Sequence, residues 1–421
     1  MVGNPDKDFR EKKWYNKSDA VNVSGLFFQR GNAMSEKFNF DEVINRRNTN
    51  SYKWNVKENE LPMWVADMDF QAAPCILEAM EKRMKLGVFG YADLPDEWYE
   101  AYQYWWKTYH DFSIEKDWLV FTTGVIPAIS TTVRKFTTPA EKVVIQTPVY
   151  NMFYNSILNN GRVVLENPLK FDGVSYEMDF EDLEKKLSDP LTTLMILCNP
   201  HNPVGKIWKK EELAKVGELC KKHHVLVLSD EIHCDLCAPG MEYTPFASVS
   251  QTCKEISITA IAPTKAFNIA GLQTAAVVAP NKGIRDRIWR ALNTDEVAEP
   301  NAFAVDVAVA AFMKGRSWNL ALREYLQENK EITDEFLKEH LPKVTMISKD
   351  ATYLLWLDVS AYTDNSKALA GFIRAKTGLF VSHGMMYHGN GNHFLRFNVA
   401  CPKETLYDGL ERLKNGLEQW K

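Results

Sequence analysis

Short apolar runs alternate with amphipathic segments through the middle of the chain. Six of these runs are rich in β-branched residues and apolar at successive positions, which is the pattern of strands covered on both faces. They span residues 142–146, 162–165, 193–198, 225–229, 256–261 and 274–279. Segments with helical spacing of apolar residues, such as 180–187 and 209–223, lie between them. The alternation predicts an α/β fold with a mostly parallel sheet covered by helices on both faces.

The pattern changes after Pro300. A long helical stretch over residues 305–341 precedes strand-like residues 352–359, a further helix and strand-like residues 395–399. These elements predict a smaller α+β domain that the long helix joins to the first. We therefore expect a large domain over residues 76–320 and a small C-terminal domain over residues 321–421. Residues 34–75 are expected to form an N-terminal segment that packs with the small domain.

The first 33 residues are polar and show no clear periodicity, and a second methionine, Met34, opens the segment that follows them. We expect residues 1–33 to be a leader that is disordered or not native to the folded protein. The alternative is an N-terminal arm that packs on a partner subunit.

Aromatic side chains recur at helical spacing over residues 93–110. A helix with one face buried in the core explains this spacing better than an aromatic platform for a cofactor or a nucleic acid. The residues concerned are Trp98, Tyr102, Trp105, Trp106 and Tyr109.

Composition excludes several classes of protein. The 421 residues are 45% hydrophobic and 25% charged with a net charge of −5, so neither a basic nucleic-acid-binding face nor a membrane-spanning run is expected. Seven scattered cysteines fit free thiols, and the charged start of the chain lacks the hydrophobic stretch of a secretory signal. We expect a cytoplasmic globular protein.

Reactive side chains follow the predicted strands. Ligands of an open parallel sheet bind beyond the carboxyl ends of its strands. Asn202, Asp230 and Lys265 come shortly after three successive strands, and the loop at Gly124 opens onto a helix. An amide, a carboxylate, a lysine and a helix N-terminus therefore converge on one rim of the sheet.

This set matches what pyridoxal phosphate requires of a protein. The cofactor needs a lysine for its Schiff base and an acid that keeps its ring nitrogen protonated. It also needs a donor near its phenolic oxygen, an aromatic face for stacking and a helix N-terminus for its phosphate. Lys265, Asp230, Asn202, Tyr150 and the Gly124 loop supply these five features.

The order of these motifs, with an arginine near the C-terminus, resembles fold-type I pyridoxal-phosphate enzymes of the aminotransferase class I/II superfamily. Four segments are similar to its cystathionine β-lyase branch, which includes bacterial C–S lyases and a related maltose-system regulator. They are residues 63–70 (MWVADMDF), 229–236 (SDEIHCDL), 264–273 (TKAFNIAGLQ) and 394–402 (FLRFNVACP). The resemblance runs from about Met34 to the C-terminus and implies an aspartate-aminotransferase-like fold with pyridoxal 5'-phosphate as cofactor.

The resemblance also implies roles for individual residues. Lys265 forms the Schiff base and then moves the Cα proton, while Asp230 pairs with the pyridinium nitrogen. His233, for which a purely structural role is the alternative, and Asn202 lie at the phenolic oxygen, with Tyr150 stacked on the ring. The residues implied at the phosphate are Gly124, Val125, Ile126 and Thr264.

The substrate side of the site is implied in the same way. Arg396 binds the substrate α-carboxylate, and Ala66 contacts the substrate. Tyr91 reaches the phosphate and the substrate from the neighbouring subunit, which makes it a third catalytic residue beside Lys265 and Asp230 and implies a homodimer with shared active sites. The chain departs from many aminotransferases at Ala262 and Gln273, where a serine and an arginine are common, and Thr264 is a possible substitute for their phosphate contacts.

Two further patterns invite a metal interpretation. Cys234 and Cys237 form a CxxC pair without a second pair at zinc spacing. His383, His388 and His393 recur every five residues in a glycine-rich segment, which favours a loop at the substrate mouth. We predict no metal site.

These features lead to a prediction of function. We expect a homodimeric C–S β-lyase that cleaves L-cystathionine or a related S-substituted L-cysteine by α,β-elimination. The products are a thiol (homocysteine), pyruvate and ammonia. An aminotransferase is one alternative because the cofactor residues are shared, and a regulatory protein that binds a transcription factor is another. The expected partners are a small amino-acid substrate and a second copy of the chain, without nucleic acid or membrane.

Overall fold

The computed structural model describes residues 38–347 and 349–421, so the predicted leader over residues 1–33 lies outside the described part. Residues Phe38–Lys421 form one compact unit, to which everything below refers. Within this part, no helix has both the length and the apolar character needed to span a membrane.

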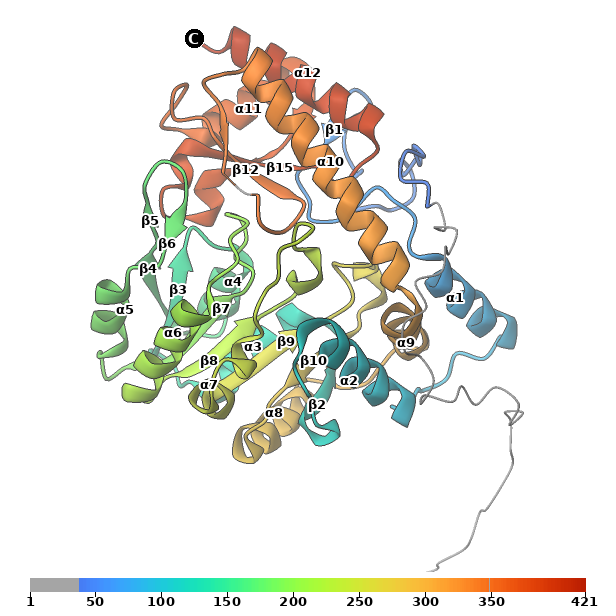
Figure 1. Ribbon diagram of the computed structural model, residues 1–421, viewed down its shortest axis with the longest axis vertical. Helices are drawn as coiled ribbons and strands as arrows, with labels where there is room; N and C mark the ends of the chain where they lie inside the picture. The colour runs from blue at the N-terminus through green and yellow to red at the C-terminus, as the bar shows by residue number, and fades with distance from the viewer. Residues whose placement is uncertain (1–37, 348) are drawn as a thin grey trace, which may run out of the picture. The chain divides into compact units, whose positions relative to one another are not determined.

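A seven-stranded sheet forms the centre of the larger part of the unit (Figure 1). Its strands follow the order β2-β10-β9-β8-β7-β3-β4, and the pairs from β9 to β4 are all parallel. Only β10 runs against its two neighbours. The strands are β2 Leu119–Thr122, β3 Lys142–Thr147, β4 Val163–Pro168, β7 Thr192–Cys198, β8 Leu226–Asp230, β9 Ser257–Ile261 and β10 Ala275–Val278. All six predicted strands are confirmed, whereas β2 was not predicted.

Helices cover both faces of this sheet, as predicted. Alternate residues of the strand β3 face opposite clusters of side chains. Val143 and Ile145 pack with the helices over residues 125–136, 152–158 and 282–294, whereas Val144 packs with those over residues 180–187 and 210–222. The helices that flank the sheet are α3 Val125–Phe136, α4 Met152–Leu158, α5 Phe180–Leu187, α6 Lys210–Lys222, α7 Gln251–Ile256 and α8 Lys282–Thr294. A short hairpin of β5 Lys170–Phe171 and β6 Tyr176–Glu177 lies beside β4 (Figure 1).

The aromatic segment is the helix α2 Asp96–His110, and its apolar face is buried as predicted. Trp98, Tyr102, Trp105 and Trp106 are at most 1% exposed and pack in one cluster with α1 Pro74–Leu86 and α9 Ala304–Lys314. The aromatic residues therefore belong to the core and do not form a binding platform.

The prediction of one long helical stretch over residues 305–341 is wrong in one respect, because these residues form two helices. The helix α9 ends at Lys314 and α10 Arg316–His340 begins after Gly315. A Cβ atom at Gly315 would lie 2.5 Å from Phe267 Cε1, so only glycine allows the chain to pack this closely against the segment after β9. Glycine is also a poor helix former, which explains the break at this position.

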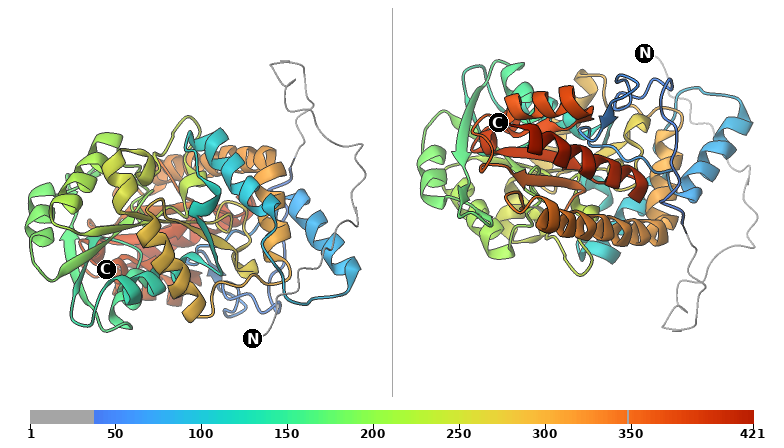
Figure 2. Two further views of the ribbon diagram at one scale, coloured as in Figure 1. Left: turned by 90° about the horizontal axis from the view of Figure 1, so that it is seen from below. Right: turned by 90° about the horizontal axis from the view of Figure 1, so that it is seen from above.

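The C-terminal part contains a four-stranded antiparallel sheet in the order β11-β12-β15-β14. Helices α10, α11 and α12 gather over it at one end of the unit (Figure 2). The new elements are β11 Thr345–Met346, β12 Leu354–Asp358, α11 Ser366–Thr377, β14 Ser382–His383, β15 Phe394–Asn398 and α12 Lys403–Gln419. This is the α+β arrangement that the sequence predicts.

The N-terminal segment runs along the C-terminal part. Its strand β1 Leu61–Pro62 pairs in parallel with β13 Leu379–Phe380, and the Asp69 amide donates to the Ala400 carbonyl at 2.9 Å. The domain boundaries at residues 75/76 and 320/321 stay predictions.

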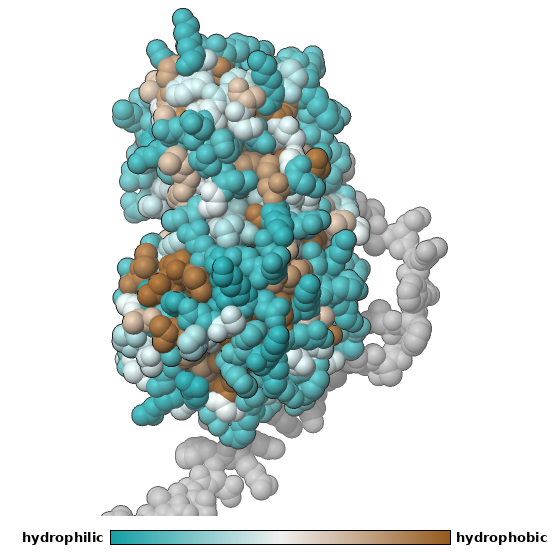
Figure 3. Space-filling model, turned by 90° about the vertical axis from the view of Figure 1, so that its left-hand side faces the viewer, coloured by the Kyte–Doolittle hydropathy of each residue, from teal (hydrophilic) through white to brown (hydrophobic). Residues whose placement is uncertain are grey.

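The face that carries α5 and the β5–β6 hairpin is mostly hydrophilic, with hydrophobic side chains gathered in a few separate patches (Figure 3).

Candidate active site

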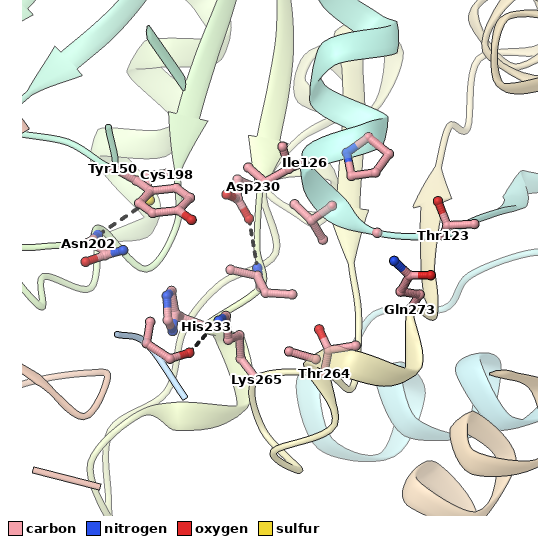
Figure 4. Close-up of a pocket in the computed structure, with 16 residues that line it drawn as sticks. Thr123, Ile126, Tyr150, Cys198, Asn202, Asp230, His233, Thr264, Lys265 and Gln273 are labelled. Atoms are coloured by element: carbon pink, nitrogen blue, oxygen red, sulfur yellow. Dashed lines mark hydrogen bonds between the residues drawn. The ribbon is translucent and has the colours of Figure 1, made fainter. Parts of the chain in front are cut away.

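A cavity of about 280 Å³ lies at the carboxyl ends of β7, β8 and β9, where the sheet topology predicts a ligand (Figure 4). Most of the predicted site residues line it although they are far apart in the sequence. These lining residues are Ala66, Gly124, Val125, Ile126, Tyr150, Asn202, Asp230, His233, Thr264 and Lys265.

Lys265 follows β9 in a turn that packs against the N-terminal segment. The side chain of Asn268 donates to the carbonyls of Met68 and Phe70 and accepts from the Met68 amide, which holds the two segments together. The Lys265 Nζ donates to the Ala66 carbonyl at 2.5 Å (Figure 4). Burial lowers the pKa of Lys265 to about 8, against an opposing effect of the Asp67 carboxylate. With a pKa about one unit above neutral pH, about a tenth of this lysine is an uncharged amine at pH 7.

Asp230 is the last residue of β8, and its carboxyl group points into the same cavity (Figure 4). Burial raises its pKa to about 7, although a hydrogen bond of 3.1 Å from the Ile232 amide and the charge of Lys265 act in the opposite direction. No ion pair reaches this carboxylate within the described ranges. A cationic group placed beside it would stabilise its charged form.

His233 and Asn202 lie on the other side of the cavity from the helix α3 (Figure 4). Burial lowers the pKa of His233 to about 3, with further contributions from the charges of Lys265 and Arg396, so the ring is neutral at physiological pH. Its Nδ1 atom is buried and has no hydrogen-bond partner among the residues described. A buried polar atom of this kind is normally satisfied, which points to a ligand atom as its partner.

The end of the cavity near α3 is suited to an anion. Gly124 is the N-cap of α3, and Val125 and Ile126 begin its first turn, where free amides and the positive end of the helix dipole face the cavity. Thr264 and Gln273 line the same cavity, so the hydroxyl predicted as a phosphate donor is present there. Ala262 does not belong to the lining residues.

Arg396 projects from β15 of the C-terminal part and is 5% exposed. One terminal nitrogen donates to the Trp64 carbonyl at 2.8 Å, and the other lies 3.5 Å from the Asn202 side-chain oxygen. The guanidinium carbon lies 4.9 Å from the centre of the Tyr387 ring, and the Nε atom has no partner in the described part of the chain. This buried cation thus lies beside the cavity without a carboxylate partner among the described residues.

Tyr91 is the one predicted site residue that lies apart from the others. Its side chain is fully exposed and borders a separate surface depression with residues 298–300. A role for Tyr91 in the site of its own chain is therefore not possible in this conformation, whereas the predicted role in a neighbouring subunit stays a prediction.

Several residues at or beside the cavity were not predicted from the sequence, among them Cys198, Trp64 and Tyr353. Cys198 ends β7 and lines the cavity, Trp64 offers its carbonyl to Arg396, and Tyr353 donates to the Ala66 carbonyl at 3.0 Å. Cys198 could have been found from its position as the last residue of the predicted strand over residues 193–198, four residues before Asn202. No local pattern indicates the other two, because their contacts join segments that are about 290 to 330 residues apart.

The patterns that invited a metal interpretation have other partners. His388 is 3.2 Å from the Glu166 carboxylate, and His393 lies 3.3 Å from the Thr363 carbonyl. Of the described residues that line the cavity, none belongs to the segment 383–393, so the predicted position of this loop at the mouth is not supported. Cys234 and Cys237, which follow His233 in the sequence, are buried free cysteines, and the Cys237 thiol donates to the Cys234 carbonyl at 3.3 Å.

Taken by their chemistry, these residues fit pyridoxal phosphate. The unpaired carboxyl of Asp230 suits a protonated ring nitrogen, the partnerless His233 Nδ1 suits the phenolic oxygen, and the start of α3 suits the phosphate. The neutral amine fraction of Lys265 suits covalent attachment to an aldehyde.

Comparison with known proteins agrees with this fit. The family model for aminotransferase class I and II matches residues 59–413. Cystathionine beta-lyase PatB of Bacillus subtilis (strain 168) is 44% identical over 386 residues, which cover 90% of this chain and all of that protein. Protein MalY of Escherichia coli (strain K12) is 32% identical over 388 residues, covering 90% of this chain and 99% of that protein.

A solved structure shows the same arrangement of the chain. Cystalysin from Treponema denticola, whose crystal structure contains a pyridoxal 5'-phosphate cofactor, is similar with a TM-score of 0.88 at 32% sequence identity. The similarity covers 91% of this chain and 100% of that chain.

Proposed function

The chain belongs to the aminotransferase class I and II family, and from this premise we propose that it is a pyridoxal-phosphate-dependent C–S β-lyase. Its substrate is L-cystathionine or a related S-substituted L-cysteine. One molecule of water is consumed and the products are a thiol, pyruvate and ammonia. For cystathionine the thiol is homocysteine.

One observation carries the cofactor chemistry. The amine of Lys265 and the carboxyl of Asp230 face one cavity, and burial moves their pKa values toward neutrality from opposite sides, to about 8 and about 7. Such paired perturbations are typical of catalytic acid and base groups. The preference for elimination over transamination is supported by the 44% identity to a cystathionine beta-lyase across nearly the whole chain.

The bound cofactor would supply an electron sink for the substrate Cα atom. Asp230 would hold the ring nitrogen in its protonated form, and His233 and Asn202 would hydrogen bond the phenolic oxygen, with Tyr150 against the ring. Gly124, Val125, Ile126 and Thr264 would bind the phosphate.

The remaining residues would act on the substrate. Arg396 would leave the Trp64 carbonyl and bind the α-carboxylate with two parallel hydrogen bonds, for which a guanidinium is well suited. Lys265 would take the Cα proton on its Nζ atom as the thiolate leaves Cβ, and Ala66 would contact the substrate through its backbone. A base with a pKa near 8 is effective at neutral pH.

A homodimer completes the proposed site. Tyr91 is fully exposed, and large apolar side chains near it in the sequence, Leu86, Val88 and Phe89, are also exposed. A second copy that covers this surface would bury them and bring Tyr91 to the partner's cavity. We place the protein in the cytoplasm because its seven cysteines are free thiols, six of them buried.

The proposal is tested by adding L-cystathionine to the purified, cofactor-loaded chain and measuring pyruvate and homocysteine. We expect the two products in a one-to-one ratio over many turnovers without a 2-oxo acid. Product formation that requires a 2-oxo acid would instead identify an aminotransferase.

Lys265→Ala serves as the matched control. This variant should lose the absorbance of lysine-attached cofactor and at least about 10³-fold in turnover, because both attachment and proton transfer depend on Nζ. Turnover near that of the unaltered chain would overturn the assignment of the base.

A further inference from the structure

Tyr353 is a buried tyrosine that the proposed chemistry does not use. Its hydroxyl donates to the Ala66 carbonyl at 3.0 Å, and the Lys265 Nζ donates to the same oxygen at 2.5 Å. Its side chain is 1% exposed, and its ring lies edge-on to His233 with 6.4 Å between the ring centres. A carbonyl oxygen has two lone pairs, so the tyrosine and the lysine together use its full capacity.

The backbone directly before Tyr353 is strained. Thr352 is buried and has a φ of +67°, which is rare for a β-branched residue. Its amide donates to the Leu236 carbonyl at 2.8 Å, and its hydroxyl accepts from the Leu354 amide at 3.1 Å. Strain that is held in place by such contacts concentrates at functional sites. The strained conformation of Thr352 sets the direction of the chain at the next residue, Tyr353.

The neighbouring carbonyls of the N-terminal segment have their own donors. The Asn398 side chain donates to the carbonyls of Val65 and Asp67 at 2.6 and 2.7 Å, and Arg396 donates to that of Trp64. Of the carbonyls of residues 64 to 67, that of Ala66 is therefore the one that accepts hydrogen bonds from both Lys265 and Tyr353.

We propose that Tyr353 is a positioning residue for Lys265, which holds the Ala66 carbonyl in place and competes with the lysine for its oxygen. The proposal rests on the proposed function only for the use of Lys265 as the base. Because the hydroxyl occupies one lone pair, the charged form of Lys265 receives less stabilisation than the carbonyl alone would give. The amine is thereby kept ready to leave this oxygen and act in the cavity.

Tyr353→Phe removes the hydroxyl and keeps the ring. The first readout needs no turnover: acetylation of Lys265 by acetic anhydride in the cofactor-free full chain, measured by peptide mass spectrometry across pH. We expect the pH of half-maximal labelling to rise, because the carbonyl then serves the ammonium group alone. An unchanged or lower value would overturn the proposal.

The second readout uses the cofactor-loaded chain. Tyr353→Phe should lower kcat for L-cystathionine about 10-fold and leave KM within about two-fold, because misplacing the base affects the proton transfer and not substrate binding. A rise in KM with kcat unchanged would contradict a positioning role.

Tyr176→Phe is the matched control. Tyr176 is 1% exposed, donates to Asn390 at 2.9 Å and accepts from the Trp356 indole at 3.1 Å, so the change also removes a buried, hydrogen-bonded hydroxyl. Tyr176→Phe should lower the melting temperature about as much as Tyr353→Phe does, without changing the pH of half-maximal labelling of Lys265. An equal shift in both variants would show a general loss of packing and overturn the proposal.

These outcomes separate the two proposals. A labelling shift in a chain that does not release pyruvate would support the role of Tyr353 and reject the lyase. Pyruvate release with unchanged labelling would do the reverse.

Discussion

Two buried aspartates five residues apart in the chain have opposite electrostatic environments. Asp230 faces the cavity, and burial raises its pKa to about 7 because only the Ile232 amide and the nearby charge of Lys265 oppose it. Burial alone would raise the pKa of Asp235 as well, but the charge and hydrogen bond of His110 outweigh it and hold that pKa below its usual value. Trp105 adds a hydrogen bond of 2.8 Å to the same carboxylate.

The difference separates a structural carboxylate from a functional one. The chain itself supplies the hydrogen-bond partners of Asp235. Trp105 and His110 of helix α2 bind its carboxylate, and the Asn319 side chain donates to its backbone carbonyl. Asp235 fixes the turn Cys234–Leu236 that follows His233. Asp230 has no such complement within the described ranges, and its unfavourable state is relieved by a cationic ligand. A buried carboxylate without a partner therefore marks the site more clearly than burial does.

The largest expected effect comes from Asp230→Asn in the loaded protein. Without the carboxylate the ring nitrogen of the cofactor is not held protonated, so pyruvate release from L-cystathionine should fall about 10³-fold or more. Steady-state kinetics with saturating cofactor measure it. Activity within ten-fold of the unaltered chain would remove Asp230 from the site.

Asp235→Asn should act on stability instead. The change removes the negative charge that His110 and Trp105 surround, at a cost of about 2 kcal/mol at pH 7. Because the folded-state pKa of Asp235 is depressed, its stabilisation exists above the unfolded-state pKa and is lost as the pH falls. Urea unfolding at pH 7 and below pH 4 measures this, and the difference between variant and unaltered chain should shrink at the lower pH. A constant difference would contradict the ionised state of Asp235.

The opposite pH dependence is expected for Asp230→Asn in the cofactor-free chain. Because the folded-state pKa of Asp230 is raised, its full contribution to the free energy of unfolding is present below the unfolded-state pKa. This contribution is lost as the pH rises through the folded-state pKa of about 7. The variant should therefore be more stable than the unaltered chain at pH 8, by about 1 kcal/mol, and nearly equal at pH 4. Thermal unfolding in the absence of cofactor measures this difference, and a variant that is less stable at pH 8 would contradict it.

The smallest effect concerns His233, which lies in the chain between the two aspartates. Since its pKa is lowered to about 3, it stays neutral from pH 5 to 9 and contributes no titration to the rate. His233→Asn should lower kcat only a few-fold and leave the acidic limb of the kcat profile in place. Loss of that limb in the variant would show that His233 titrates during turnover.

Much of the site could be predicted because it follows from topology. Asp230 ends one parallel strand, and Asn202 and Lys265 come shortly after its two neighbours, so any fold of this class brings them to one rim. The helix N-terminus at Gly124 is predictable for the same local reason. The strand β2 was not predicted although its four residues are all buried, and a single long helix was predicted through Gly315 because periodicity alone does not show the approach of Phe267.

The sequence by itself determined the class of fold, the strand ends and the residue types that one cofactor requires, because period and strand order are local properties of the chain. Only the tertiary structure decided that Arg396 rests on the Trp64 carbonyl and that Tyr353 shares the Ala66 carbonyl with Lys265. It also decided which of two buried aspartates is left without a partner. These facts depend on contacts between segments that lie hundreds of residues apart, and burial and pairing, which set the charge of a group, exist only once those segments have packed.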